Sequence, residues 1–248
     1  MEELDELFGV LKFSNTEEKG VENSETEEIQ EITLVLDKEH NNMIEIIKQC
    51  YDIYFLHGAR SSKKTDCLHN FIKSIIDSVI IEKKLSYYSC KTEYNVPSIN
   101  ASGRKKCDIV LLKNLIPVAV FPVKLIMTNY FQNKNNYWEQ LTGELTHLKF
   151  QNPELKIFPI NIIPTKIPYL TSKKMIAKIE IVSYENSFKI YEFLEKNKIV
   201  SKNFNFLIDV IHKSESINEL YNKSPDIIGF ASSTPFISIK NEMSNVII

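Results

Sequence analysis

Hydrophobic positions follow a helical period in three parts of the chain, within 41–56, within 67–84 and within 137–149. Positions 84–96 instead alternate between apolar and polar residues, as expected for a half-buried strand. Two apolar, β-prone runs follow, CDIVLL and AVFPVKLIM, with a turn predicted between them at Lys113-Asn114. This order predicts a helix, a strand, a two-stranded hairpin and another helix along the middle of the chain.

The second half of the chain continues the alternation of strands and helices. An apolar run at 157–163 predicts a buried strand, 173–185 predicts another strand, and 186–200 has the pattern of an amphipathic helix. Residues 204–223 are predicted to add one or two further helices, and the apolar end of the chain is interpreted as a terminal strand or a dimer contact. The pattern therefore predicts an α/β fold with a central mixed β-sheet flanked by helices.

Charge is distributed unevenly along the 248 residues. Residues 1–50 contain 14 acidic and 4 basic side chains, which leaves 18 acidic and 26 basic ones for the rest of the chain. Residues 14–31 are rich in glutamate and have too few apolar side chains to form a core. We therefore predict an acidic, partly disordered segment at 1–40 and a single α/β domain at 41–248. The basic domain suits a polyanionic partner, although its charge is also ordinary for a protein surface.

Cysteine spacing and hydropathy exclude several classes of protein. The four cysteines lie far apart and form no CxxC pair, which predicts reduced thiols, without a zinc site or a disulfide framework. No apolar run approaches the roughly 18–20 residues of a membrane span, and no signal peptide is recognisable. These features predict a cytoplasmic protein with no membrane association.

Lys124 lies inside an apolar run, where a lysine is seldom buried without a partner. It either snorkels outward from an edge strand or faces a functional site. A hairpin that turns at Lys113-Asn114 would bring Asp108, at the start of the preceding run, close to Lys124. A carboxylate and an ammonium at one end of a sheet can together hold a divalent metal and a phosphate.

This pattern resembles the PD-(D/E)xK nuclease superfamily, which includes many type II restriction endonucleases. Its motif is an aspartate that starts one strand, followed by a carboxylate-x-lysine triplet on the next strand. Asp108 matches the aspartate and Lys124 the lysine, whereas Cys107 and Pro122 replace the motif's proline and second carboxylate. The resemblance covers roughly residues 60–185. It implies a restriction-endonuclease-like core and Mg²⁺-dependent hydrolysis of phosphodiester bonds, with Mn²⁺ able to substitute.

Some restriction enzymes of this superfamily take the second carboxylate from the helix after the hairpin. The apolar face of that helix is predicted to contain Tyr137, Trp138, Leu141, Leu145 and Leu148. Glu144 and Gln140 lie one turn apart at the edge of this face, so we predict Glu144 as the second metal ligand and Gln140 as its neighbour. Glu139 lies nearly opposite the apolar face and is the fallback, and a plain solvated glutamate remains an alternative for each.

Basic and amide side chains around this region are predicted to contact nucleic acid. They are Arg60, Lys63, Lys64, Arg104, Lys105, Asn133 and Asn136. The expected partner is double-stranded DNA, and a homodimer is expected because cleavage of both strands needs two sites. Two alternatives stay open: a catalytically inactive DNA-binding or assembly protein on the same fold, for which Pro122 is the reason, and a structure-specific repair or resolvase nuclease.

Overall fold

The computed structural model describes residues 22–59, 61–233 and 236–247, with side chains from residue 38 onward. The chain divides into two units, Met1–Lys38 and Glu39–Ile248. Helix α1 (Glu22–His57) spans this boundary, and the other elements lie in the second unit. Residues 22–40 are helical, and the rest of the segment for which partial disorder was predicted lies outside the described residues.

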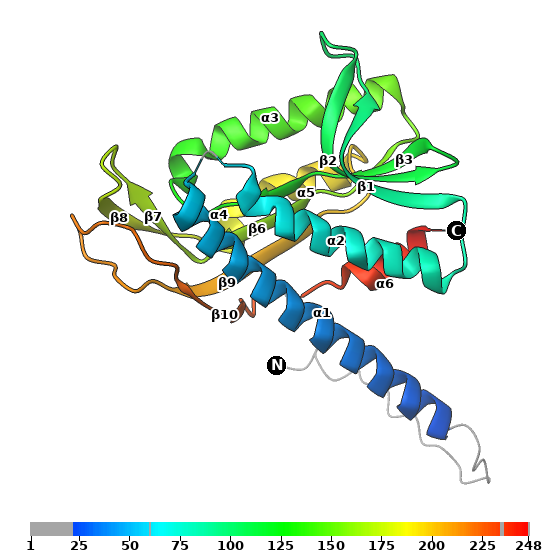
Figure 1. Cartoon of the computed structure of the whole chain (residues 1–248), viewed down its shortest axis with the longest axis horizontal. Helices are drawn as coiled ribbons and strands as arrows, with labels where there is room; N and C mark the ends of the chain where they lie inside the picture. The colour runs from blue at the N-terminus through cyan, green and yellow to red at the C-terminus, as the bar shows by residue number, and fades with distance from the viewer. Residues whose placement is uncertain (1–21, 60, 234–235, 248) are drawn as a thin grey trace, which may run out of the picture. The chain divides into compact units, whose positions relative to one another are not determined.

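The second unit contains mixed sheets flanked by helices, which confirms the predicted α/β class (Figure 1). After α1 the elements are α2 (Lys63–Glu82), β1 (Tyr88–Pro97), β2 (Arg104–Lys113), β3 (Ile116–Phe121), β4 (Val123–Leu125), α3 (Tyr130–Gln151), β5 (Lys156–Ile157), β6 (Ile160–Pro164), β7 (Lys166–Leu170), β8 (Ile176–Ile181), α4 (Tyr184–Ser187), α5 (Lys189–Lys196), β9 (Phe204–Ile211), β10 (Asp226–Phe230) and α6 (Ile239–Val246).

Two four-stranded sheets have the orders β1-β2-β3-β5 and β10-β9-β6-β4, and β7 and β8 form a separate hairpin. β1, β2 and β3 are antiparallel neighbours, whereas β3 pairs with β5, and β4 with β6, in parallel. The two parallel pairs keep one register, because Val120 pairs with Ile157 and Val123 with Ile160. The sheets therefore meet where Pro122, which has no N–H group, interrupts the ladder between β3 and β4.

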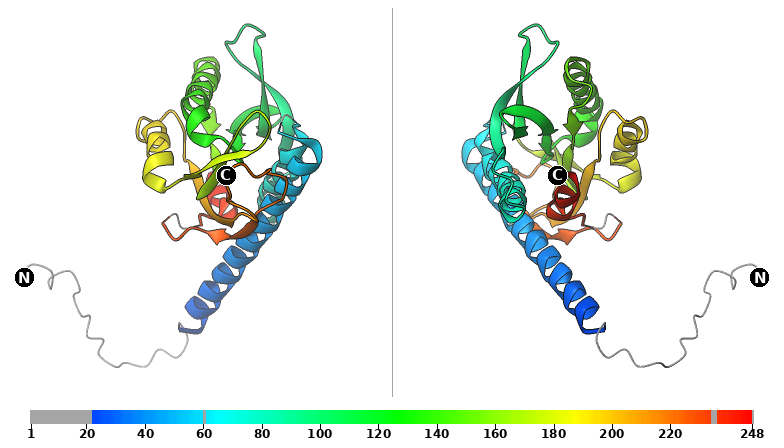
Figure 2. Two further views of the ribbon diagram at one scale, coloured as in Figure 1. Left: turned by 90° about the vertical axis from the view of Figure 1, so that its left-hand side faces the viewer. Right: turned by 90° about the vertical axis from the view of Figure 1, so that its right-hand side faces the viewer.

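Helices cover both faces of these sheets, so the apolar residues form two cores (Figure 2). The α2-side core joins α1, α2 and α6 to the sheet, and the α3-side core joins α3 and α5 to its other face. Along β2, Ile109 and Leu111 belong to the α2-side core, whereas Val110 and Leu112 belong to the α3-side core. This alternation explains why the run CDIVLL is apolar at almost every position.

The apolar face predicted for α3 is confirmed. Leu145 and Leu148 are buried in the α3-side core, and Tyr137, Trp138 and Leu141 pack against it while partly exposed. Because this face follows the helical period, the helix could be oriented on the sheet from the sequence alone.

The helical prediction for residues 204–223 was wrong. Residues 204–211 form β9, a strand that pairs in parallel with β6 and antiparallel with β10. Ile208 is buried, whereas Ile211 and Leu220 are 56% and 46% exposed. A short apolar run fits a buried strand as well as a helix, and the pairing with β6 decided between them. The tail also differs, because it ends in the helix α6 and not in a strand.

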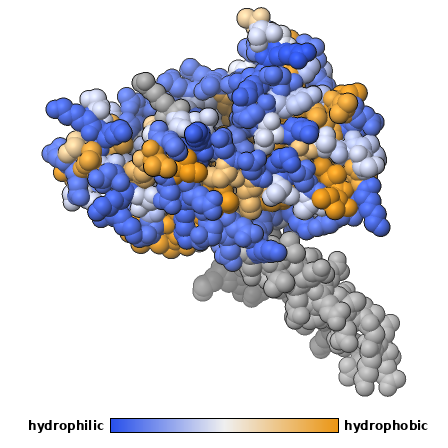
Figure 3. Space-filling model, viewed as in Figure 1, coloured by the Kyte–Doolittle hydropathy of each residue, from blue (hydrophilic) through white to orange (hydrophobic). Residues whose placement is uncertain are grey.

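Among the described residues, no helix is both long and apolar enough to cross a bilayer. On the face seen in Figure 3, hydrophobic residues form separate patches among hydrophilic ones. The large exposed hydrophobic side chains belong to many different elements, for example Leu115 and Ile116 at the β2–β3 turn and Phe150 in α3.

Candidate functional site

The predicted hairpin is present and brings Asp108 to the point where the chain passes from one sheet to the other. Ile109 pairs with Phe121, and the Asp108 carboxylate accepts a hydrogen bond of 2.8 Å from the backbone N–H of Val123. The turn lies one residue later than predicted, at Asn114-Leu115, where both residues have positive φ angles (50° and 66°). Such a two-residue turn matches the twist of antiparallel strands.

At Glu93 and Asp108 the β1–β2 ribbon turns over, so that the side that faces one core before this point faces the other core after it. Cys90 belongs to the α2-side core, but Val96, also an even-numbered residue of β1, belongs to the α3-side core. Glu93 has a φ of 53°, a left-handed conformation that is uncommon for glutamate. Its neighbours Thr92 and Tyr94 pair with Ile109 and Cys107, so Glu93 lies across from Asp108. Two carboxylates therefore meet where the ribbon turns from one core to the other.

Lys124 is half-buried in β4, and it lines the cavity that Asp108 also lines. Its ammonium lies 4.1 Å from the centre of the Tyr137 ring, and no carboxylate of the described residues pairs with it. Burial lowers the pKa of Lys124, and the nearby ammonium of Lys64 lowers it further, while Asp108 raises it. The face of the Tyr137 ring attracts the Lys124 ammonium but, unlike a carboxylate, does not neutralise its charge.

Lys124 and Asp108 line one cavity of about 290 Å³, together with Gln140 and Glu144 from α3. The sequence-predicted core site is thus brought together in one place. Glu144 forms an ion pair with Lys105 of β2, and the Gln140 amide donates to Glu144 at 3.4 Å. Glu139 is exposed and does not line this cavity, which agrees with its interpretation as a solvated charge.

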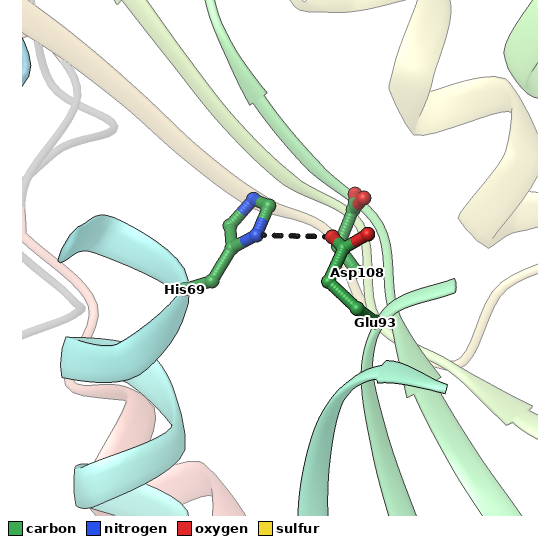
Figure 4. Close-up of side chains that lie close together, drawn as sticks. All are labelled: His69, Glu93 and Asp108. Carbon is green, nitrogen blue, oxygen red and sulfur yellow. Dashed lines mark ion pairs between the residues drawn. The ribbon is translucent and has the colours of Figure 1, made fainter. Parts of the chain in front are cut away.

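A group of three potential metal ligands adjoins this cavity through Asp108. His69 of α2, Glu93 of β1 and Asp108 of β2 each offer one ligand atom, and these atoms lie within 4.8 Å of one another. Figure 4 shows the His69 ring pointing from α2 toward the two carboxylates. The Nδ1 atom of His69 is 3.6 Å from the nearer Glu93 oxygen. Burial raises the pKa of Asp108, while the N–H of Val123 and the proximity of His69 lower it.

The donor set fits a divalent cation. His69 is only 6% exposed, and its Nδ1 atom has no hydrogen-bond partner among the described residues. Its distance to Glu93 is too long for a hydrogen bond, so a buried polar atom is left unpaired beside two carboxylates. An imidazole and two carboxylates suit ions such as Mn²⁺. A cation bound between them would satisfy all three groups.

The sequence analysis missed His69, Glu93 and Asn161. His69 follows Leu68 on the apolar face of α2, so a polar residue within an apolar stripe was the available indication. Glu93 had none, because it lies at an ordinary polar position of an alternating strand. Asn161 is buried in the otherwise apolar strand β6, pairs with Lys124 in register, lines the same cavity and donates to Asn205 at 2.9 Å.

The residues predicted to contact nucleic acid differ in exposure and in the groups they contact. Arg60 lies outside the described residues, and Lys63, Arg104 and Asn136 are exposed. Lys105 is paired with Glu144, and the Asn133 amide donates to the backbone of Asn129. Lys64 is half-buried, and its ammonium contacts the backbone oxygen of Ala59. Of these residues, Lys105 and Lys64 lie close enough to the site to affect its charges.

No family model, curated protein or solved structure matches this chain.

Proposed function

We propose that this protein is a metal-dependent endonuclease that hydrolyses phosphodiester bonds of duplex DNA with a PD-(D/E)xK-like site. The observation that carries the proposal is the convergence of His69, Glu93 and Asp108 within 4.8 Å, next to the cavity that Asp108 shares with Lys124. A carboxylate cluster beside an unneutralised ammonium is the arrangement that binding of a cation and a phosphate requires. The order of helix, antiparallel strands, helix and parallel strand is compatible with the restriction-endonuclease-like core that the resemblance implies.

The chain's own residues have separate roles in this proposal. His69, Glu93 and Asp108 would hold Mg²⁺ or Mn²⁺, and the imidazole favours Mn²⁺ more than an all-oxygen site would. The bound ion would lower the pKa of a water molecule and offset charge on the phosphate. The hydrogen bond from Val123 fixes the Asp108 carboxylate, and the Tyr137 ring fixes the Lys124 ammonium. Lys124 would donate to a phosphate oxygen or orient the attacking water.

We infer a different role for Glu144 from the one predicted. The metal-ligand group among the described residues does not include it, and its carboxylate is paired with Lys105. We infer that Glu93 supplies the carboxylate that Pro122 cannot, and that Glu144 and Gln140 form the opposite wall of the cavity. The second ligand thus comes from the preceding strand and not from the following helix.

A plasmid cleavage assay tests the proposed function. Purified protein is incubated with supercoiled plasmid in Mg²⁺, in Mn²⁺ or with a chelator, and discrete fragments are expected with metal alone. Asp108→Ala and Lys124→Ala should each abolish cleavage, whereas Lys173→Ala, which changes an exposed lysine outside the predicted site and the predicted DNA contacts, should leave it nearly unchanged. Wild-type activity of either site variant would refute the assignment of the site. Cutting of branched or single-stranded DNA alone would instead identify a structure-specific nuclease.

Pro122 and the ion pair of Glu144 favour one alternative, a catalytically silent protein that binds or assembles on DNA. If this alternative holds, the protein would shift duplex DNA in a mobility-shift assay yet leave the plasmid intact with either metal. The homodimer that we propose for double-strand cleavage is tested separately, by the mass of the protein in solution with and without duplex DNA.

A further inference from the structure

Two cysteine thiols lie in contact at the other side of the helix that supplies His69. The sulfur atoms of Cys50, in α1, and Cys67, in the first turns of α2, are 3.3 Å apart. Cys50 is fully buried and Cys67 is partly exposed. Both residues belong to the second unit of the chain, Glu39–Ile248, so their contact lies within one compact body.

We propose that Cys50 and Cys67 form a redox modification site, at which a hydroperoxide converts the two thiols into a disulfide and thereby displaces His69 from Glu93 and Asp108. The crosslink itself is independent of the proposed function, but its consequence for metal binding rests on the metal site proposed above. Cysteine spacing did not predict this pair, because sixteen residues separate Cys50 from Cys67 and only the packing of α1 against α2 brings them together.

The geometry favours this pair over the other thiols. A disulfide bond is about 2.05 Å long, so the two sulfurs have to approach by about 1.2 Å. Cys67 is accessible to a small oxidant, whereas Cys50 lies behind it as the thiol that completes the bond. Cys90 and Cys107 are both buried, and no sulfur–sulfur contact is found for either among the described residues.

The reaction balances with one hydroperoxide. The Cys67 sulfur attacks one oxygen of hydrogen peroxide, the O–O bond breaks, and the released hydroxide takes up the thiol proton to give a sulfenic acid and water. The Cys50 sulfur then attacks the Cys67 sulfur, an S–S bond forms, and the S–O bond breaks. The leaving hydroxide takes the Cys50 proton, so two thiols are oxidised and one peroxide is reduced to two waters.

The position of Cys67 on α2 links this reaction to the metal ligands. Cys67 and His69 are two residues apart and therefore point in nearly opposite directions, about 200° apart around the helix. Cys67 faces α1, whereas His69 faces the two carboxylates (Figure 4). A pull on Cys67 toward α1 moves the helix away from the sheet on the side of His69. Metal sites tolerate displacements of only about 0.2 Å, which is much less than the approach that the sulfurs need.

The first experiment counts thiols and uses no metal. Full-length protein is treated with a small excess of hydrogen peroxide, and the product is examined by thiol titration after unfolding, by intact mass and by peptide mapping. We expect two of the four thiols to disappear, a link between the peptides that contain Cys50 and Cys67, and full reversal by dithiothreitol. Cys50→Ala and Cys67→Ser should each abolish the link, and Cys90→Ala should not. Four remaining thiols, or a link that involves other cysteines, would overturn the proposal.

The second experiment measures Mn²⁺ binding by calorimetry to the reduced and the crosslinked protein. We expect at least about a tenfold weaker affinity after crosslinking, restored by dithiothreitol. Peroxide-treated Cys67→Ser should keep the affinity of the reduced protein, and because Cys67 is partly exposed this variant is expected to fold. Equal affinity of the two redox states would overturn the coupling. If the reduced protein binds no Mn²⁺, the metal site and the coupling are both wrong, while the thiol count still decides the crosslink.

Discussion

Replacement of His69 by leucine tests whether this histidine is retained for a metal at the expense of stability. In the absence of metal, its Nδ1 atom is buried without a hydrogen bond. Leucine has a similar volume and no polar atom, so it removes the unpaired nitrogen without opening a large cavity. We therefore expect His69→Leu to stabilise the metal-free protein, although most substitutions of buried residues are destabilising.

The size of the effect follows from the contacts of His69. An unpaired buried polar atom costs about 1–3 kcal/mol, and the low end applies here because Glu93 lies 3.6 Å away and attracts the ring. The free energy of unfolding should rise by about 1 kcal/mol, which corresponds to about 2–4 °C in Tm for a domain of this size. Mn²⁺ at a hundred times its Kd should add about 2.7 kcal/mol to the wild type and almost nothing to the variant. The order of stability should therefore reverse when metal is added.

The assay is chemical unfolding of both proteins with a chelator and with saturating Mn²⁺. His212→Leu is the matched control, because His212 is equally buried and its Nδ1 atom is also unpaired, yet it lies outside the group of potential ligands. Its Nε2 atom is hydrogen-bonded to the backbone of Lys166, so this variant should lose stability and keep the full response to Mn²⁺. An equal gain from Mn²⁺ in His69→Leu and in the wild type would refute the assignment of His69 as a ligand.

Three further predictions concern the same site. The free energy of unfolding of the metal-free protein should fall as pH rises above the ordinary aspartate pKa of 3.8. Burial raises the pKa of Asp108, so the folded state holds the proton more tightly than the unfolded state. Asp108→Asn should lack this pH-dependent loss of stability in unfolding curves measured between about pH 3 and 7. Tyr137→Leu should slow plasmid cleavage by about 2- to 5-fold, since the contact of the ring with the Lys124 ammonium contributes about 0.5–1 kcal/mol, and an unchanged rate would count against that role. Asn161→Leu should leave the Asn205 amide unpaired and lower stability by about 1–3 kcal/mol in urea unfolding, with a variant as stable as the wild type contradicting the pairing.

The sequence determined the elements whose pattern is local. The period of apolar residues predicted helices where α2, α3 and α5 lie, and it predicted the face of α3 that packs on the sheet. The lysine inside an apolar run and the aspartate at the start of another were enough to predict the hairpin and the proximity of Asp108 and Lys124, which line one cavity. Local pattern sufficed there because a hairpin with a two-residue turn fixes which residues face each other.

Contacts between distant segments determined three features that no local pattern predicts: the strand at 204–211, the partner of Glu144 and the position of Glu93 beside Asp108. The apolar run at 204–211 became a strand because β6 and β10 offered it partners, and no local pattern encodes a partner. The partner of Glu144 is Lys105, which lies 39 residues earlier in the chain, and this ion pair could not be predicted from the local sequence. Glu93 entered the site because the ribbon of β1 and β2 exchanges its faces there. The hairpin thus follows from a local pattern, whereas the proximity of His69 to Glu93 and Asp108 follows from where α2 packs on the sheet.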